Sequence, residues 1–176
     1  YENGKMIENP FKKWSDINSS LPEIDIDVLA PPPSSGTRDA FVELVLHDVC
    51  KSKYKMDKKT YKENCSALRE DGFVTEVGEN DNLIIEKLTD NSERFGIFGF
   101  SFLDQNRDRV QGSFVDGIEP SFDNIADGSY KVSRPLYFYV KKEHIGVVPG
   151  IEDYTDYFMS LSIEGGPLED AGLIPN

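Results

Sequence analysis

The sequence lacks several features that mark common functional classes. It has no apolar run of about 18 to 20 residues, the length that crosses a bilayer; its longer apolar stretches are residues 41–46, interrupted by Glu43, and 136–140. Lys and Arg number 19 against 32 Asp and Glu, which gives a net charge of −13, and no segment forms a basic stripe. Because a field of this sign repels a phosphate backbone, we expect neither a membrane span nor a nucleic-acid partner.

Signatures of familiar enzymes and metal sites are also missing. The sequence contains no GxSxG elbow, no GxxxxGK[ST] loop and no HExxH pair, and its two histidines and two cysteines form no zinc-ligand pattern. The acidic pairs Asp25/Asp27 and Glu79/Asp81 lack the Asp-x-Asp-x-Asp-Gly spacing of a calcium loop. We therefore expect no enzymatic activity, no cofactor and no metal site.

The cysteine content leaves two interpretations open. Cys50 and Cys65 have 14 residues between them, and neither belongs to a CxxC pair. Two buried free thiols fit this spacing. A disulfide also fits it, and in an oxidising compartment the closed loop would add about 3 kcal/mol of stability.

What is present suits one globular domain. The chain has 176 residues, of which 38% are hydrophobic, and it contains 14 glycines, so it can bury a core. It begins without Met or an apolar leader and ends in the loop-like run 173–176. We therefore expect a piece of a longer protein.

Hydrophobic periodicity predicts alternating strands and helices. Period-two alternation, β-branched and aromatic runs, and Gly or Pro boundaries predict strands; apolar residues at helical spacing predict helices. The expected strands are 24–29, 73–77, 95–100, 110–115 and 130–140, and the expected helices are 40–49, 58–70, 83–89, 121–125 and a segment from 151 onward. Asn80 or Asp81 is the expected cap of the helix 83–89, and Ser121 begins the expected capped turn 121–125. This alternation predicts an α/β fold, a three-layer αβα sandwich.

The segment from Pro31 to Asp39 joins the first predicted strand to the first long helix. A loop at this place exposes unpaired N–H groups, and the helix dipole adds partial positive charge there. The candidate anion ligands are Ser35, Gly36, Thr37 and Arg38. The same residues also fit an ordinary helix N-cap, and from the residues alone both interpretations stay open.

Four segments, in matching order and spacing, resemble one known family. They are 9–18 (NPFKKWSDIN), 31–39 (PPPSSGTRD), 95–99 (FGIFG), and 127–130 (DGSY) followed by 133–137 (SRPLY). Together they look like the phosphate-binding proteins of bacterial phosphate ABC importers, the PstS-like family. The resemblance covers residues 9–140.

The resemblance implies a class II periplasmic-binding-protein fold, in which two α/β lobes close over one phosphate. It places residues 1–129 in the second, phosphate-binding lobe. Residues 130–140 would form a crossing strand, and residues 130–176 would belong with an N-terminal lobe that this chain lacks. A secretory signal and this first lobe would lie upstream of Tyr1. Half of the ligand donors would then be absent, so we expect this chain alone to bind phosphate weakly or not at all.

The family's Ser-Gly-Thr element maps onto Ser35, Gly36 and Thr37, which the resemblance makes phosphate ligands through hydroxyl and N–H groups. Several family members place an arginine four residues before that serine, where this chain has Pro31. Arg38 is the substitute candidate, although it fits a salt bridge to Asp39 equally well.

The resemblance implies a periplasmic solute-binding protein that delivers inorganic phosphate to ABC permease subunits. Two alternatives stay open: the same fold used for sulfate or another oxyanion, and a signalling or interaction protein that has lost transport. In the family, the carboxylate that distinguishes protonated phosphate from sulfate lies on the absent lobe.

Overall fold

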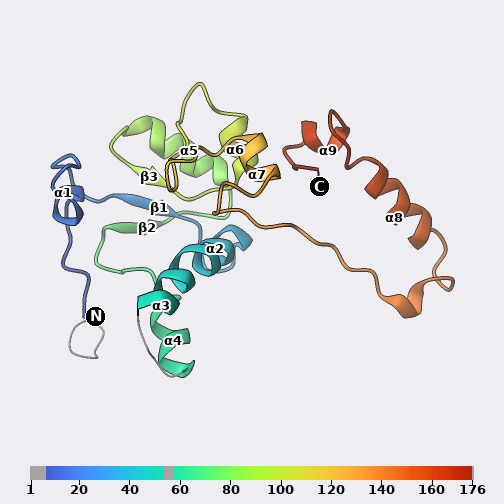
Figure 1. Ribbon diagram of the computed structural model, residues 1–176, viewed down its shortest axis with the longest axis horizontal. Coiled ribbons are helices and arrows are strands. Elements are labelled where there is room, and N and C mark those ends of the chain that lie inside the picture. The colour runs from blue at the N-terminus through green and yellow to red at the C-terminus, as the bar shows by residue number, and fades with distance from the viewer. Residues whose placement is uncertain (1–6, 54–57, 176) are drawn as a thin grey trace. The chain divides into compact units, whose positions relative to one another are not determined.

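The computed structural model describes residues 7–53 and 58–175. The chain divides into two compact units between Gln111 and Gly112. Figure 1 labels the helices and strands of each. This division precedes the predicted boundary at 129/130, and the assignment of residues 130–176 to another lobe stays a prediction. Each unit is described separately below.

The first unit contains a three-stranded parallel sheet, which confirms the α/β class. Its strands are β1 (Val28–Ala30), β2 (Val74–Glu76) and β3 (Phe95–Gly96), in the order β2-β1-β3. β1 is shorter than the predicted strand 24–29, because residue 25 pairs only as an isolated antiparallel bridge to residue 13. Of the predicted strand 95–100, only two residues pair, and residue 100 already begins a helix.

Short helices connect and flank these strands. They are α1 (Trp14–Ile17), α2 (Gly36–Phe41), the π-helical η1 (Val42–His47), α3 (Asp48–Lys53), α4 (Lys58–Asn64), α5 (Asp81–Asp90) and α6 (Phe100–Asp104). α2, η1 and α3 follow one another without a break, so the predicted helix 40–49 is confirmed within a longer one. α4 ends at residue 64, before the predicted end at 70.

The core of this unit lies where α5 packs on the sheet. Leu29 of β1, Val77 and Ile84 of α5 form a buried cluster, against which Leu88 packs. α5 begins where the sequence predicts a cap, because the Asn80 side chain accepts a hydrogen bond from the N–H of residue 82 at 3.0 Å. Burial of its apolar face holds α5 against the sheet.

Glycine at position 96 allows this packing. A Cβ there would lie 2.7 Å from Ile84 Cγ2 and 2.9 Å from Leu88 Cδ1, much closer than van der Waals contact. The helix therefore approaches β3 more closely than any other residue type at this position would permit.

The two cysteines form a disulfide that connects α3 to the residue following α4. Of the two interpretations that the spacing left open, the disulfide is therefore the correct one. Cys65 is buried, and beside it Ser66 Oγ lies 2.9 Å from Nε2 of His47. The His47 ring also contacts the Tyr61 ring, so this histidine is part of the packing around the disulfide.

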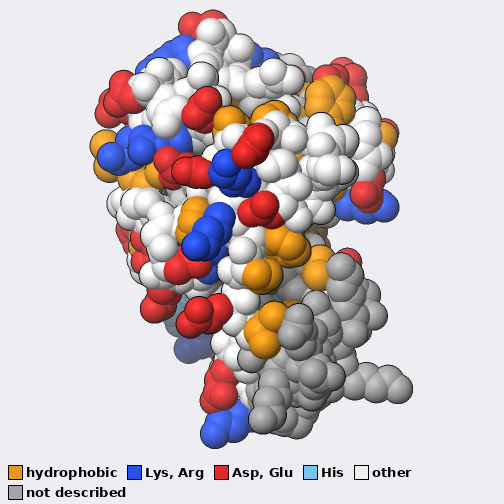
Figure 2. Space-filling view, turned by 90° about the vertical axis from the view of Figure 1, so that its left-hand side faces the viewer, with side chains coloured by type: hydrophobic (Ala, Val, Ile, Leu, Met, Phe, Trp, Pro, Cys, Tyr) orange, Lys and Arg blue, Asp and Glu red, His pale blue; other side chains and the backbone are white. Residues whose placement is uncertain are grey.

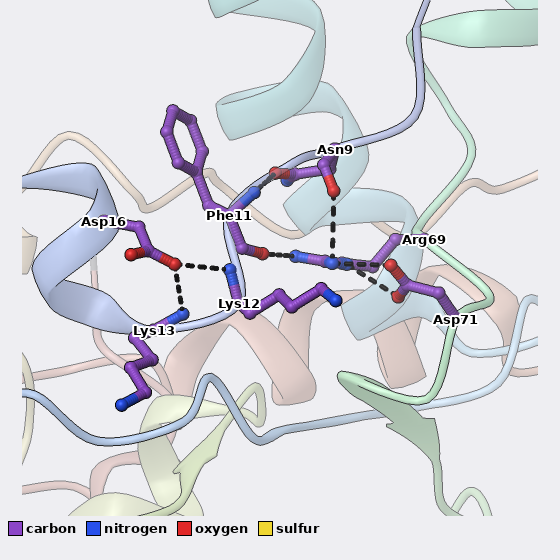
Figure 3. A network of polar contacts seen from close by, with 7 residues as sticks. All are labelled: Asn9, Phe11, Lys12, Lys13, Asp16, Arg69 and Asp71. Carbon is purple, nitrogen blue, oxygen red and sulfur yellow. Dashed lines mark hydrogen bonds and ion pairs between the residues drawn. The ribbon is translucent and has the colours of Figure 1, made fainter.

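A polar network holds the segment before α1 (Figure 3). Arg69 donates to the carbonyl oxygen of Phe11 at 2.7 Å and to both carboxylate oxygens of Asp71, while its guanidinium lies over the Phe73 ring. The Arg69 guanidinium lowers the pKa of the Asp71 carboxyl below its ordinary value. The Asp16 carboxylate accepts the N–H groups of residues 12 and 13.

Charge is distributed rather than concentrated on the face that carries α1. Figure 2 shows acidic and basic side chains interspersed there, with hydrophobic side chains in small groups between them. Several acidic groups on this unit are already paired, including Glu23 with Lys13 at 2.8 Å and Asp27 with Arg94 at 2.6 Å. The net negative charge therefore creates no single acidic surface on this face.

The second unit is helical where the structure assigns regular elements. It contains α7 (Phe122–Ala126), η2 (Lys142–His144), α8 (Ile151–Ser160) and α9 (Pro167–Asp170). α7 begins at the predicted cap, because Ser121 Oγ accepts the N–H of residue 124 at 3.2 Å. The prediction of helix from 151 onward is confirmed by α8.

Two predicted strands of this region do not form. Among the described residues, 110–115 contribute only the bridge between Val115 and Ile118, and 130–140 pair with no strand. In Figure 1 the latter segment runs as a long connection without regular structure. Its apolar side chains face solvent, with Leu136 75% and Tyr139 90% exposed. The composition of this segment favours a strand, but a strand forms only when it pairs with another strand. No described residue pairs with this segment as a strand.

Candidate functional site

The carboxyl ends of the three parallel strands bring three loops to one edge of the sheet. The loops are 31–35 after β1, 77–80 after β2 and 97–99 after β3. Hydrogen bonds from the N–H of Val77 to the carbonyl of Ala30 (2.8 Å), and from Ile97 to Leu29 (2.9 Å), continue the ladder to the start of these loops. Ligands of open parallel sheets bind at this kind of edge.

Ser35 caps the helix that begins at Gly36. Its Oγ accepts the N–H of Thr37 at 3.2 Å, and its carbonyl accepts the N–H of Asp39 at 3.1 Å. Its own N–H is bonded to the carbonyl of Pro32 at 3.0 Å. The N-cap interpretation of this loop is therefore confirmed, and it fixes the backbone in one conformation.

The cap leaves other donors of the same turn unused. Within residues 7–53 and 58–175, the N–H groups of Gly36 and Arg38 and the hydroxyl of Thr37 have no hydrogen-bond partner. Gly36 is exposed, and no atom lies within 4 Å of the place where its Cβ would be. The first turn therefore presents an open set of neutral donors at the positive end of a helix dipole.

The Arg38 side chain extends beneath the loop. It is 8% exposed, and its Nη1 lies 3.1 Å from the carbonyl oxygen of Pro31 and 3.2 Å from Oε1 of Glu76 at the end of β2. The guanidinium therefore supports the proline turn, and its charge is opposed by a carboxylate. Glu76 was not predicted as a partner, because 38 residues separate the two in the sequence.

Two carboxylates, one in the second loop and one at the start of α5, bond to the first and third loops. Glu79 Oε1 accepts the Ser34 hydroxyl at 2.6 Å, although the two residues are 45 positions apart. The buried Asp81 carboxylate accepts the N–H of Gly99 at 3.0 Å, in the turn that begins α6. Sequence reasoning noted Glu79 and Asp81 only as an acidic pair; their place directly after a strand was the signal that they lie at this edge.

Among the described residues of the second unit lies a hollow of about 500 Å³. Its lining includes Phe138, Lys141, His144 and Tyr154. The Phe138 ring meets the Phe158 ring edge to face. The lining of the hollow mixes apolar side chains with polar ones, and large aromatic side chains remain exposed around it. The hollow lies within a surface that exposes several large apolar side chains.

Metal and membrane sites receive no support in the described ranges. There, no His, Cys, Asp and Glu residues gather into a group that would hold a metal ion. Nor does any helix in those ranges have the length and apolar character needed to cross a bilayer.

Comparison with known proteins shows a consistent likeness. Residues 3–162 match the family model of the PBP superfamily domain. The chain is 30% identical over 175 residues to the phosphate-binding protein PstS of Staphylococcus haemolyticus, covering 97% of this chain and 48% of that protein. It is 31% identical over 168 residues to PstS of Staphylococcus epidermidis, covering 93% of this chain and 44% of that protein. The chain thus spans about half the length of these curated relatives.

Two crystal structures share the fold. One is of a possible phosphate binding protein from Planctomyces limnophilus, with a TM-score of 0.58, 23% identity, and coverage of 85% of this chain and 48% of that one. The other is of PstS from Borrelia burgdorferi, with a TM-score of 0.54, 17% identity, and coverage of 85% and 52%. The predicted αβα fold is confirmed by these likenesses.

Proposed function

Because the chain belongs to the PBP superfamily, we propose that it is one lobe of a solute-binding protein that holds inorganic phosphate non-covalently. The open donors of the turn at Gly36 carry this proposal. The relatives' name, phosphate-binding protein, supports phosphate as the anion. The protein would act outside the cytoplasmic membrane, deliver phosphate to ABC permease subunits, and make or break no bond.

The proposed ligands are Ser35, Gly36, Thr37 and Arg38. Gly36 and Arg38 offer main-chain N–H groups and Thr37 offers a hydroxyl, all without partners among the described residues. The Ser35 hydroxyl accepts the cap bond and keeps its own proton for the anion. Such neutral donors, fixed in place by the cap, bind an anion strongly because each hydrogen bond to it is charge-assisted.

The Arg38 guanidinium is proposed to attract the bound phosphate only at short range. It also contributes indirectly, by holding the turn that carries the ligands. It holds the carbonyl of Pro31, and Glu76 opposes its charge. Phosphate affinity then rests mainly on hydroxyl and N–H groups rather than on a full positive charge. This arrangement compensates for the proline at position 31, where several family members have arginine.

We also propose that residues 130–176 pack against a first lobe. Their exposed aromatic side chains support this, since Tyr137, Tyr139, Tyr154 and Tyr157 are each at least 65% exposed. Apolar surface of this kind is normally covered in the working protein. The half-length match to the relatives is consistent with a partner lobe of the same polypeptide.

Calorimetric titration of the purified full-length protein with phosphate tests the site. Combined Ser35→Ala and Thr37→Ala changes remove both hydroxyls, and loss of hydrogen bonds to a charged ligand at about 1.5–3 kcal/mol each weakens binding at least about 100-fold. Thr37→Val isolates the hydroxyl that has no other partner. Thr75→Val, at an exposed position of β2, is the matched control and leaves affinity unchanged.

Two results would contradict the proposal. Phosphate binding that survives the double change would show that the anion lies elsewhere. A full-length protein that gives neither heat nor thermal shift with phosphate would instead favour the signalling or interaction role.

A further inference from the structure

We propose that Asp116 is a site of spontaneous covalent modification, at which the bond to Gly117 rearranges through a cyclic imide to isoaspartate. The reaction needs no enzyme, cofactor or oxidant, and the inference does not depend on the proposed phosphate role. The sequence contains three Asp-Gly pairs, at 71–72, 116–117 and 127–128. The fold leaves the reacting groups of the middle pair accessible and engages those of the other two.

The rearrangement requires two groups of an Asp-Gly pair to meet. The main-chain nitrogen of Gly117 attacks Cγ of Asp116, so that a C–N bond forms and a carboxyl C–O bond breaks. The amide hydrogen and the carboxyl hydroxyl leave together as water. Water then adds to one carbonyl of the imide: opening at the carbonyl attached to Cα gives isoaspartate, whose main chain runs through Cβ and Cγ, and opening at Cγ restores aspartate. Glycine favours the attack because no side chain shields its nitrogen.

Asp116 lies in an exposed two-residue turn. Val115 and Ile118 exchange N–H to carbonyl hydrogen bonds of 2.9 and 3.0 Å, and φ between them is 52° at Asp116 and 80° at Gly117. Among the described residues, Asp116 is the one residue other than glycine with a positive φ. This backbone conformation carries strain, although Asp tolerates it better than most residues. The bridge belongs to no described strand, so the turn opens at low cost.

Both reacting groups of this turn are accessible. The Gly117 N–H has no hydrogen-bond partner within residues 7–53 and 58–175, and no atom beyond its chain neighbours lies within 4 Å of the place where its Cβ would be. The Asp116 carboxylate contacts Nζ of Lys131 at 3.0 Å, but the two side chains are 68% and 73% exposed. An exposed ion pair of this kind is weak and is screened by salt, so it does not keep the carboxyl from the nitrogen.

The carboxyl of Asp71 is held by an arginine. Arg69 donates from Nε to Oδ1 of Asp71 at 2.7 Å and from Nη2 to Oδ2, and the arginine side chain is only 13% exposed. This two-point contact fixes the plane of the carboxylate and lowers the pKa of the Asp71 carboxyl. An ionised carboxylate is a poor target for a nucleophile, so the pair at 71–72 holds little of the neutral acid that reacts.

The nitrogen of the third pair is occupied. The Gly128 N–H donates to the carbonyl oxygen of Ile125 at 3.2 Å, where α7 ends. The Asp127 carboxylate accepts the N–H of Ser129 at 2.8 Å, and hydrogen bonds from Ser129 lower the pKa of the Asp127 carboxyl. Because both the nucleophile and its target are engaged, we expect this pair to react slowly as well.

Peptide mapping of the purified full-length protein tests the assignment. The protein is incubated near neutral pH, and isoaspartate is measured by enzymatic methylation and mass spectrometry in chymotryptic peptides, which separate the three pairs. The urea-unfolded chain is the reference, because there the three pairs react at similar rates. In the folded protein we expect isoaspartate to form at Asp116 at least about tenfold faster than at Asp71 or Asp127. The Asn3-Gly4 pair lies outside the described residues and is quantified in its own peptide.

Two variants that each remove one cation provide a matched comparison. Arg69→Gln releases the Asp71 carboxyl and raises its rate toward the unfolded value. Lys131→Gln leaves the rate at Asp116 within about twofold of the wild type, because the exposed pair contributes little. Asp127 is the internal gauge of folding in both variants, since its rate rises only if the fold is lost.

The rates in the wild type decide the proposal. Isoaspartate that accumulates at Asp116, while Asp71 and Asp127 stay slow, supports it. Equal rates at the three pairs of the folded protein, or a faster rate at either of the other two, would overturn it. An Asp116 rate about tenfold lower in the folded than in the unfolded chain would also overturn it, because the turn would then protect the pair.

Discussion

Replacing Gly96 by alanine should destabilise the first unit. The added Cβ would meet Ile84 Cγ2 at 2.7 Å and Leu88 Cδ1 at 2.9 Å. Carbon atoms pack best at about 3.5–4.0 Å, so the helix and strand must separate by several tenths of an ångström or more. Ile84 is 0% exposed, and its Cγ2 is attached directly to Cβ, so this methyl moves only if the rotamer or the helix moves.

The magnitude follows from two opposing effects. Overpacking of a well-filled core costs about 1–3 kcal/mol. The alanine also lowers the conformational entropy of the unfolded chain, which stabilises the folded state by about 0.4–1 kcal/mol. We therefore expect a net loss of about 1–2 kcal/mol, or a decrease in Tm of roughly 2–8 °C for a chain of this size.

Urea unfolding measures this loss, with Gly78→Ala as the matched control. The Cβ at position 78 would lie 3.5 Å from Leu83 Cδ1, which is ordinary contact, so the control should be neutral or slightly stabilising. In the Gly96→Ala background, Leu88→Ala should cost about 0.5–3 kcal/mol less than it costs in the wild type. A Gly96→Ala protein with wild-type stability and an unchanged m-value would refute the argument from close packing.

Two further predictions concern stability. The double change Cys50→Ser and Cys65→Ser should lower the free energy of unfolding by about 3 kcal/mol under oxidising conditions, because the disulfide closes a loop with a sequence separation of 15. Denaturant unfolding should give the same stability for this variant and for the reduced wild type. A variant as stable as the oxidised wild type would contradict the prediction. The Arg69 guanidinium lowers the pKa of the Asp71 carboxyl in the folded state. The interaction between the two side chains therefore stabilises the fold fully above about pH 4, the pKa of an unfolded Asp, and this stabilisation is lost as the pH falls through the lower pKa of the folded state. Asp71→Asn should therefore be less stable at neutral pH and should lose less stability on acidification; parallel pH curves for the two proteins would count against it.

Local signals predicted the parts of the fold that depend on neighbouring residues. Ser35, Asn80 and Ser121 all cap helices, as their positions before apolar-periodic segments indicate. The spacing of the two cysteines was compatible with a disulfide, and the structure shows that the disulfide forms. These features involve few residues and little sequence separation.

The strands of the second unit show where local composition is insufficient. Residues 130–140 have strong β-propensity, yet pairing depends on a partner that lies outside the segment. The same limit applies to the candidate site. Its turn was visible in the order Ser-Gly-Thr, whereas the contacts of Glu79 and Glu76 join residues far apart in the sequence and follow only from the parallel order of β1 and β2.

The buried carboxylate of Asp81 serves two segments at once. It lies in the first turn of α5, where a negative charge is favoured by the helix dipole, and it also receives the N–H of Gly99. The start of one helix and the turn that opens another are thereby fastened by a single side chain. The proposed anion site at this edge of the sheet would therefore be preorganised by the protein's own hydrogen bonds.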